Sequence, residues 1–156
     1  GVNFSQTHAE SLQLDWRATY LAILQDLGAK NIKLLTDWDK VEAENNKYQF
    51  DAIDWQLAQA QYHNATVIYV VGMKSGRWPE CHIPGWADSM SLNKVQQQYE
   101  ILEYIKEVVQ RYKDNKTVFD CFLLQINKNG TFYREPSVPS RLGFQIDEQG
   151  RVRLDE

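Results

Sequence analysis

The segment Ala65-Thr-Val-Ile-Tyr-Val-Val71 decides the fold class of this chain. Its residues are mostly β-branched or aromatic, and they do not alternate between polar and apolar types as a half-exposed strand does. Nearly continuous apolar content is typical of a strand that is covered on both faces, as in the parallel sheets of α/β proteins. The segment therefore predicts an inner strand of such a sheet.

Strand and helix patterns alternate on both sides of this segment. We expect strands at residues 2–4, 31–36 and 118–126 and helices at residues 14–27, 51–63 and 91–113. Asp15 and Ser91 are the expected helix N-caps, and Gly28 and Asn64 are the expected helix ends. The order is β-α-β-α-β-α-β, and right-handed crossovers make these strands parallel.

Alternating units of this kind build either an open doubly wound sheet or a (β/α) barrel. No Gly-x-Gly-x-x-Gly motif follows the first strand, and no phosphate-binding loop is present, which favours the barrel. A complete barrel takes about 250 residues, and this chain has 156. We therefore expect an α/β fold, a partial (β/α)₈ TIM barrel of about four βα units over residues 1–130. The tail at residues 131–156 is expected to be irregular or disordered, or to form a hairpin that turns at Gln149 and Gly150.

Composition excludes several classes of partner. The net charge is −4 and no run of Lys or Arg occurs, so nucleic acid is not an expected partner. No apolar stretch approaches the roughly 20 residues of a membrane span. Cys81 and Cys121 lack the spacing of metal ligands, so we expect no metal and no cofactor. The sequence does not indicate in which cellular compartment the chain resides. The open edges of a half-barrel sheet predict self-association.

Two segments rich in aromatic and charged residues follow strand-like runs, at residues 36–51 and 77–86. In parallel α/β folds, ligands bind where the strands end. Aromatic faces beside carboxylates and a histidine suit a sugar, which needs a flat apolar surface and partners for its hydroxyls. The expected substrate-binding residues are Trp38, Glu42, Arg77, Trp78, Glu80 and His82, with Asn3 at the end of the first strand.

Several of these residues also have a structural interpretation. Trp38 either stacks on a sugar or caps the core, and Glu42 either binds substrate or pairs with a neighbouring cation. Lys33 either lies near a catalytic centre or is solvated. We favour a binding role for His82 and Trp78. Two further tryptophans, Trp55 and Trp86, are expected to be packing residues.

The motifs Asp37-Trp-Asp-Lys-Val-Glu42 and Lys47-Tyr-Gln-Phe-Asp51 resemble the second-strand region of the (β/α)₈ retaining glycoside hydrolases of the cellulase and β-galactosidase type. Arg77-Trp-Pro-Glu-Cys-His-Ile-Pro-Gly-Trp86 resembles the third-strand loop of a bacterial branch of that group. The resemblance implies hydrolysis of O-glycosidic bonds in an oligosaccharide or polysaccharide, with retention of configuration.

The chain departs from that family at Leu124-Gln-Ile-Asn-Lys-Asn-Gly130. Asn129 stands at the position of the family's acid/base glutamate, and an amide cannot donate or recover the required proton. The nucleophile, a glutamate on the family's seventh strand, has no counterpart in these residues. We therefore expect a truncated or degenerate glycosidase chain that is inactive alone. The alternatives are a non-catalytic carbohydrate-binding protein and an inactive fragment.

Overall fold

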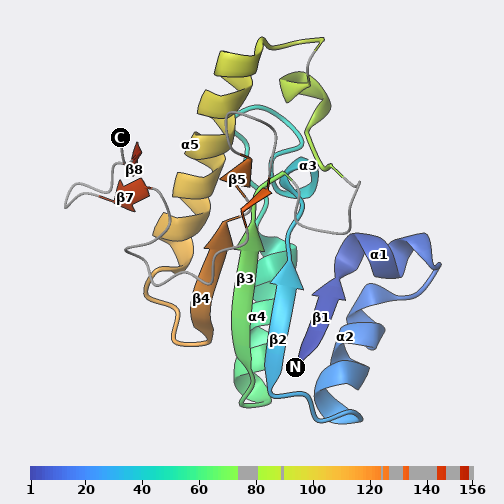
Figure 1. The fold of residues 1–156 in the computed structure, drawn as a ribbon. Helices are drawn as coiled ribbons and strands as arrows, with labels where there is room; N and C mark the ends of the chain where they lie inside the picture. Colours follow the sequence, from blue (N-terminus) through green and yellow to red (C-terminus); the bar gives the residue numbers. More distant parts are fainter. Residues whose placement is uncertain are drawn as a thin grey trace.

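Four parallel strands form the main sheet. The computed structural model describes residues 1–73, 81–88, 90–123, 125–126, 132–133, 144–146 and 152–154. The strands are β1 (Val2–Ser5), β2 (Asn31–Leu35), β3 (Thr66–Val71) and β4 (Val118–Leu123), and they pair in the order β1-β2-β3-β4. All four point the same way, as Figure 1 shows. The parallel α/β prediction is confirmed.

The strand order separates the two architectures that the sequence allowed. A doubly wound sheet reverses its strand order at a switch point. Here each strand pairs with the next one along the chain and no reversal occurs among the four strands. Sequential parallel pairing is the arrangement of strands in a (β/α) barrel, so the chain forms part of a barrel.

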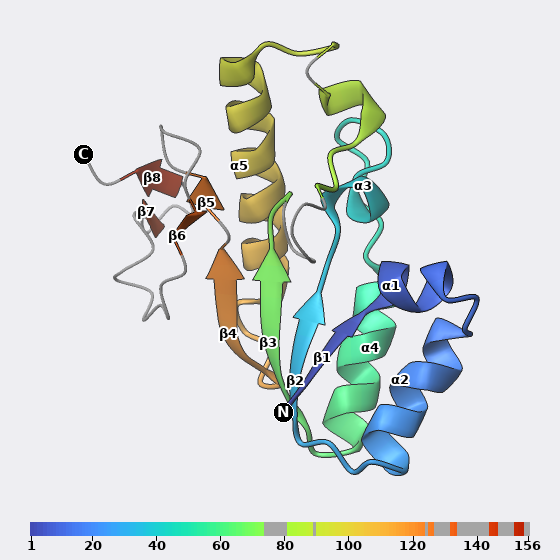
Figure 2. The ribbon, with the colours of Figure 1, turned by 45° about the vertical axis from the view of Figure 1, so that its right-hand side comes forward.

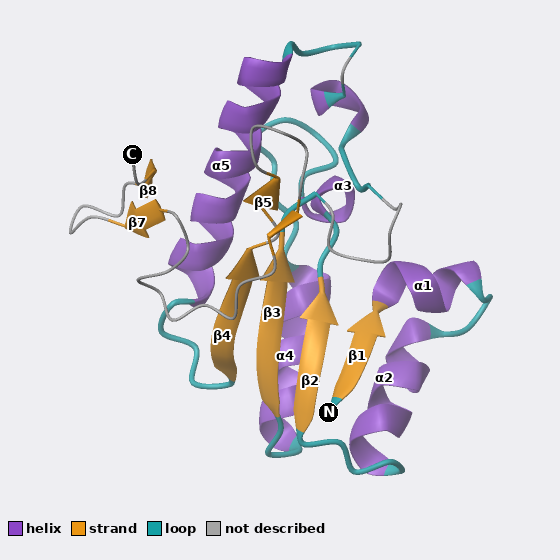
Figure 3. Cartoon of the chain, in the orientation of Figure 1, coloured by secondary structure: helices purple, strands orange, loops and turns teal. Residues whose placement is uncertain are grey.

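Three long helices connect the strands and cover one face of the sheet, as Figures 2 and 3 show together. They are α2 (Trp16–Gln25), α4 (Asp51–Tyr62) and α5 (Lys94–Tyr112). Two short helices, α1 (Gln6–Ser11) and α3 (Trp38–Val41), and the 3₁₀ turn η1 (Gly85–Ala87) lie near the carboxyl ends of the strands. Neither short helix was predicted from the sequence.

The hydrophobic core lies between the sheet and these helices. Alternate strand residues, including Ile32 and Leu34 of β2, are buried there. Aromatic pairs join the two layers: Phe4 and Tyr20 have ring centroids 4.8 Å apart, and Tyr69 and Tyr112 have centroids 5.6 Å apart. The apolar alternation in the strands therefore fixes which face carries the helices.

The opposite face carries Asn3, Lys33 and Ile68, which form one row across β1, β2 and β3. Asn3 was expected at the end of the first strand, but β1 runs to Ser5, so Asn3 lies inside the strand. Its place is a correction to the prediction. Strands rise about 3.3 Å per residue, so Asn3 lies some 6–7 Å below the strand end.

Helix caps agree with the sequence in one case and differ in another. The side chain of Asp15 accepts hydrogen bonds from the amides of Arg17 and Ala18, which confirms it as the N-cap of α2. The N-cap of α5 is Asn93, which forms a capping box with Gln96. The predicted cap, Ser91, was wrong because the Asn93 carboxamide and the Gln96 side chain satisfy each other's backbone amides.

The inner face of α5 begins only after its first turns. Val95 and Tyr99 have the helical spacing of the buried residues, but they are 74% and 61% exposed. The buried residues are Tyr104, Ile105, Val108 and Tyr112. The helix has 19 residues, which is about 28 Å, and its first turns extend past the carboxyl ends of the strands (Figure 1).

Beyond Leu123 the chain leaves the parallel sheet. β5 (Gln125–Ile126) pairs antiparallel with β6 (Phe132–Tyr133), so the fourth strand is shorter than predicted. β7 (Phe144–Ile146) pairs antiparallel with β8 (Val152–Leu154), which is the pairing that a hairpin in the tail requires. Within the described residues, no helix combines the length and apolarity needed to cross a membrane.

Candidate functional site

The carboxyl ends of β1, β2 and β3 bring together polar side chains from three separate segments. Thr7 follows β1 in the first turn of α1, Asp37 follows β2, and His82 lies in the segment after β3. Parallel strands end at the same edge of a sheet, so these residues meet although they are far apart in sequence. We call Asp37, Asp39 and His82 the rim cluster.

His82 lies between two carboxylates. Its Nε2 is 3.5 Å from Asp37 Oδ1, and its Nδ1 is 3.7 Å from Asp39 Oδ2. Both distances exceed an ordinary hydrogen bond, so each carboxylate and its ring nitrogen can share a hydroxyl or a water. The amide of His82 donates to the carbonyl of Met73 at 2.7 Å, which fixes the backbone where the segment returns to the sheet.

The two carboxylates differ in exposure. The side chain of Asp37 is 3% exposed and accepts a hydrogen bond from the hydroxyl of Thr7. The side chain of Asp39 is 38% exposed, and that of His82 is 15% exposed. Asp37 is thus held in place inside, while Asp39 reaches solvent in part and His82 is exposed only at its edge.

The rim cluster has two chemical capacities. It offers hydrogen-bond acceptors beside an imidazole, a combination that can hold sugar hydroxyls. Its three ligand-type atoms also lie within 4.8 Å of one another, so these residues could hold a divalent cation. The sequence-based expectation of no metal rested on cysteine spacing, which does not reveal ligands that two different segments bring together.

Trp38 and Glu42 form a buried pair next to the rim. Trp38 Nε1 donates to Glu42 Oε2 at 2.8 Å, and the amide of Asn46 donates to Glu42 Oε1 at 2.9 Å. Burial raises the pKa of the neighbouring Tyr48, and the negative charge of Glu42 raises it further. By accepting these two hydrogen bonds, the Glu42 carboxylate holds the loop after α3 in place. This is a structural role, not a contact with substrate.

The proposed sugar-stacking role of Trp38 is corrected by its surroundings. The indole is 0% exposed, lies stacked with Tyr104 at 5.9 Å, and receives the edge contact of Trp86 at 5.9 Å. A stacking surface needs a free face, and Trp38 has none. Glu42 is 1% exposed, so direct contact with substrate is equally unsupported.

Other site predictions divide into two groups. Trp86 and Trp55 pack against the core, as expected, and Trp86 Nε1 also donates to the carbonyl of Glu42 at 2.9 Å. Arg77, Trp78, Glu80 and Asn129 lie outside the described residues, so their binding and acid/base assignments stay predictions. Asn3 is exposed on the face away from the helices, below the rim.

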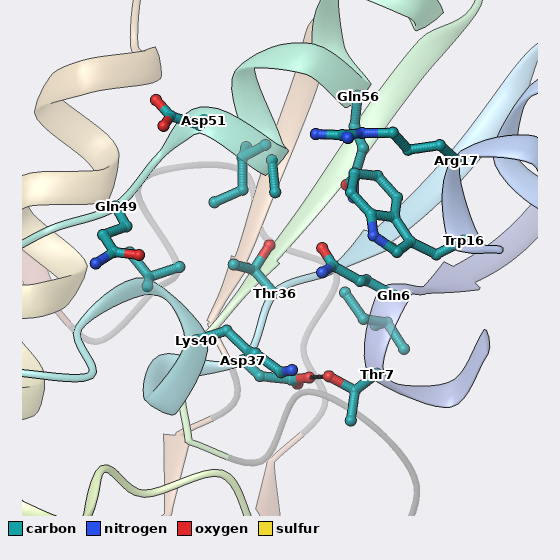
Figure 4. A pocket seen from close by; sticks show the side chains of 14 residues that line it. Gln6, Thr7, Trp16, Arg17, Thr36, Asp37, Lys40, Gln49, Asp51 and Gln56 are labelled. Atoms are coloured by element: carbon teal, nitrogen blue, oxygen red, sulfur yellow. Dashed lines mark hydrogen bonds between the residues drawn. The ribbon is translucent and has the colours of Figure 1, made fainter. Parts of the chain in front are cut away.

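A pocket lies beside the rim cluster, between the first and second βα units (Figure 4). Its volume is about 340 Å³. Asp37 and Thr7 border it from the rim side, and the first turns of α2 and α4 border it from the helix side. It therefore shares one wall with the rim cluster but opens away from His82, which does not line it.

The sequence missed three polar residues of this region. Asp37 and Asp39 were read as part of a motif and not as binding residues, although an Asp-x-Asp directly after a strand signals a charged rim. Thr36 carried no signal, because a threonine at a strand end is common. Its importance comes only from burial without a hydrogen-bond partner.

Fold and strand order define a partial (β/α) barrel with its polar residues at the carboxyl ends of the strands. The family model of glycosyl hydrolase family 10 matches residues 12–145. The chain belongs to glycosyl hydrolase family 10. This confirms the resemblance to TIM-barrel glycosidases. A comparison with curated protein sequences found no match.

Solved structures of similar fold are glycosidases. A GH5_18 protein from Streptomyces cattleya in complex with GlcNAc has a TM-score of 0.63 and 12% identity, over 92% of this chain and 38% of that one. A GH5_18 variant from Bifidobacterium longum subsp. longum in complex with Manβ1-4GlcNAc has a TM-score of 0.61 and 15% identity, over 79% and 32%. A β-galactosidase from Halorubrum lacusprofundi has a TM-score of 0.53 and 14% identity, over 79% and 20%. This chain thus spans well under half of each structure.

Proposed function

We propose that the rim cluster binds a β-linked hexopyranoside and that this chain contributes the substrate-binding half of a retaining glycosidase barrel. The observation that carries the proposal is the position of His82 between Asp37 and Asp39 at the carboxyl ends of parallel strands. Active sites of β/α barrels form at this end of the strands. Membership of a glycosyl hydrolase family supports carbohydrate as the ligand class.

The structural neighbours suggest which sugars to test first. Two of them are complexes with GlcNAc and Manβ1-4GlcNAc, and the third is a β-galactosidase. The sugars are all hexopyranose units, and the last two proteins imply β linkages. A rim that offers two carboxylates and an imidazole suits equatorial hydroxyls of such a ring, since each hydroxyl can donate to a carboxylate and accept from an N–H.

We further propose that the 156-residue chain binds without hydrolysing. A retaining glycosidase uses two carboxyl groups about 5 Å apart, one as nucleophile and one as acid/base. Asn129 occupies the acid/base position in the motif. The amide oxygen is too weak a base, and the amide nitrogen too weak an acid, for either proton transfer. The isolated 156-residue chain is therefore proposed to bind carbohydrate without catalysis.

The test is a calorimetric titration of the 156-residue chain with cello-, manno- and galacto-oligosaccharides. We expect saturable binding that weakens about tenfold or more in His82→Ala and Asp39→Asn, because the first removes the hydrogen-bonding ring and the second removes the negative charge and one of two acceptor oxygens. Asp26→Asn, an exposed carboxylate at the far end of α2, is the matched control and should bind as the unchanged chain does.

A panel of aryl glycosides tests the second half of the proposal. We expect no turnover above that of buffer. Turnover that survives Asn129→Ala would show that other residues supply the acid/base, and the non-hydrolysing assignment would be wrong. Equal affinity of the control and both rim variants would remove the rim cluster from the binding site.

A further inference from the structure

Two buried residues with polar side chains, Thr36 and Gln56, line the pocket between the first and second βα units. Thr36 at the end of β2 is 6% exposed, and its Oγ1 makes no hydrogen bond with any described residue. Gln56 on α4 is 3% exposed, and its amide makes no hydrogen bond to another described residue. Burying a polar group without a partner costs about 1–3 kcal/mol, and this cost applies to the Thr36 hydroxyl, which a ligand in the pocket would relieve.

The pocket is large enough for more than a trapped water. Its volume of about 340 Å³ falls within the range of roughly 300–1,000 Å³ that small-molecule sites occupy. Figure 4 shows Thr36 facing it from the sheet, and Gln56 beside Trp16 and Arg17 on its other side. The two groups thus approach the same space from two different elements.

Charges around the pocket are balanced. Arg17 and Lys40 carry positive charge, and Asp37 and Asp51 carry negative charge. Three of these four already have partners, since the guanidinium of Arg17 lies 4.9 Å from the Trp16 ring, Lys40 binds Glu10 at 2.9 Å and Asp37 accepts from Thr7. An anion or a cation would find no excess of opposite charge here. Apart from Asp51, the remaining polar capacity is neutral and is supplied by Gln49, Gln56 and Thr36, since the amide of Gln6 already donates to Glu10 at 2.8 Å.

We propose that this pocket binds a neutral polyhydroxylated molecule of the size of one monosaccharide unit, held by the Thr36 hydroxyl and the Gln56 amide. Hydroxyl groups both donate and accept, as do the hydroxyl of Thr36 and the carboxamide of Gln56. The Trp16 ring supplies apolar surface on one wall. The pocket adjoins the rim cluster through Asp37 but is a different site, since His82 and Asp39 do not line it.

Saturation-transfer-difference NMR of the 156-residue chain tests this site with methyl β-D-glucopyranoside and methyl β-D-galactopyranoside as neutral probes and inorganic phosphate as the anionic one. Thr36→Val and Gln56→Met keep side-chain volume while removing the polar atoms. We expect each to weaken binding of a neutral probe about tenfold. Asp26→Asn, an exposed carboxylate at the far end of α2 that does not line the pocket, is the matched control and should leave this binding unchanged.

Unfolding measurements separate binding from structure. Thr36→Val should not lower the unfolding midpoint, because the hydroxyl has no protein partner to lose. The proposal is overturned if neither glycoside gives a saturable signal at concentrations well above about 1 mM. It is also overturned if both variants bind the glycosides as tightly as the unchanged chain, the result expected if only water fills the pocket. Displacement of the glycosides by phosphate would overturn it as well. If the rim variants bind sugar normally but Thr36→Val and Gln56→Met weaken glycoside binding, the pocket proposal stands and the rim proposal is wrong. If only the rim variants weaken binding, the pocket proposal alone is wrong.

Discussion

Trp38 and Glu42 are joined by a 2.8 Å hydrogen bond inside the protein, from the indole Nε1 to the carboxylate Oε2. The bond closes one helical turn, from the start of α3 to the residue that ends it. The carbonyl of Glu42 also accepts from Trp86. This pair therefore fixes the loop after β2 to the turn after β3, and it holds the Asp37–Asp39 segment in place.

Removing the carboxylate of Glu42 should destabilise the fold. Glu42→Ala leaves the Trp38 indole and the Asn46 amide without acceptors, each at a cost of about 1–3 kcal/mol. We expect a loss of about 2–4 kcal/mol in the free energy of unfolding measured by urea. Glu42→Gln retains one acceptor oxygen and should lose less.

Trp38→Phe supplies the complementary test. The ring is enclosed by Tyr104 and Trp86, so its truncation should lower stability and leave sugar affinity at the rim nearly unchanged. A variant as stable as the original that no longer binds sugar would return Trp38 to the substrate-binding residues.

Substitutions at Asn93 and Ser91 test which of the two residues caps the N-terminus of α5. Asn93→Ala should cost about 1 kcal/mol of stability, because the amides of Val95 and Gln96 lose their acceptor. Asn93→Ser should restore most of it. Ser91→Ala should change stability little, and a larger loss for Ser91→Ala than for Asn93→Ala would place the cap where the sequence alone had put it.

Acid should remove one specific contribution to stability. Burial favours the protonated form of Asp54, but hydrogen bonds from Arg111 and Tyr112 outweigh it and lower the pKa of Asp54 below its usual value. A carboxyl group with a depressed folded pKa stabilises the protein above its unfolded pKa, near 3.9, and loses that contribution as the pH falls through the folded pKa.

Asp54→Asn should therefore be less stable than the unchanged chain at pH 7, with the difference shrinking below about pH 4. Thermal unfolding across that pH range measures it, with Asp26→Asn as the control. A difference that persists unchanged into acid would mean that the contact with Arg111 does not depend on charge.

The open sheet predicts association between chains. β1 and β4 are the outer strands of the four-stranded sheet, and edge strands carry backbone groups that seek partners. Sedimentation equilibrium should show dimers or larger species that increase with protein concentration. A clean monomer with a high unfolding midpoint would contradict this expectation.

The sequence predicted the layered fold well because the fold depends on local patterns. The continuous apolar run at residues 65–71 and the helix signals around Asp15 and Asn64 appear as β3, α2 and α4, with Asn64 in the left-handed region at φ 53°. Short helices escaped detection. α3 has four residues and is stabilised by the buried bond between Trp38 and Glu42, which no periodicity reveals.

The candidate site was harder to predict because it depends on contacts between segments that are far apart in the sequence. His82 lies at the carboxyl ends of the strands, but its neighbours Asp37 and Asp39 come from another loop, and only coordinates bring the three together. Trp38 was assigned by its position after a strand. Position after a strand does not show whether a ring faces the rim or, as here, packs on Tyr104, so the sequence could not decide the role of Trp38.

The most direct test of the account follows backbone amide and His82 ring signals by NMR while a β-linked disaccharide such as Manβ1-4GlcNAc is added. The account predicts saturable shifts concentrated at the carboxyl ends of the strands, in residues 5–7, 36–42 and 81–86, with the His82 ring among the largest. Shifts confined to the opposite end of the sheet, around residues 29–31 and 64–66, or none at saturating disaccharide, would contradict it.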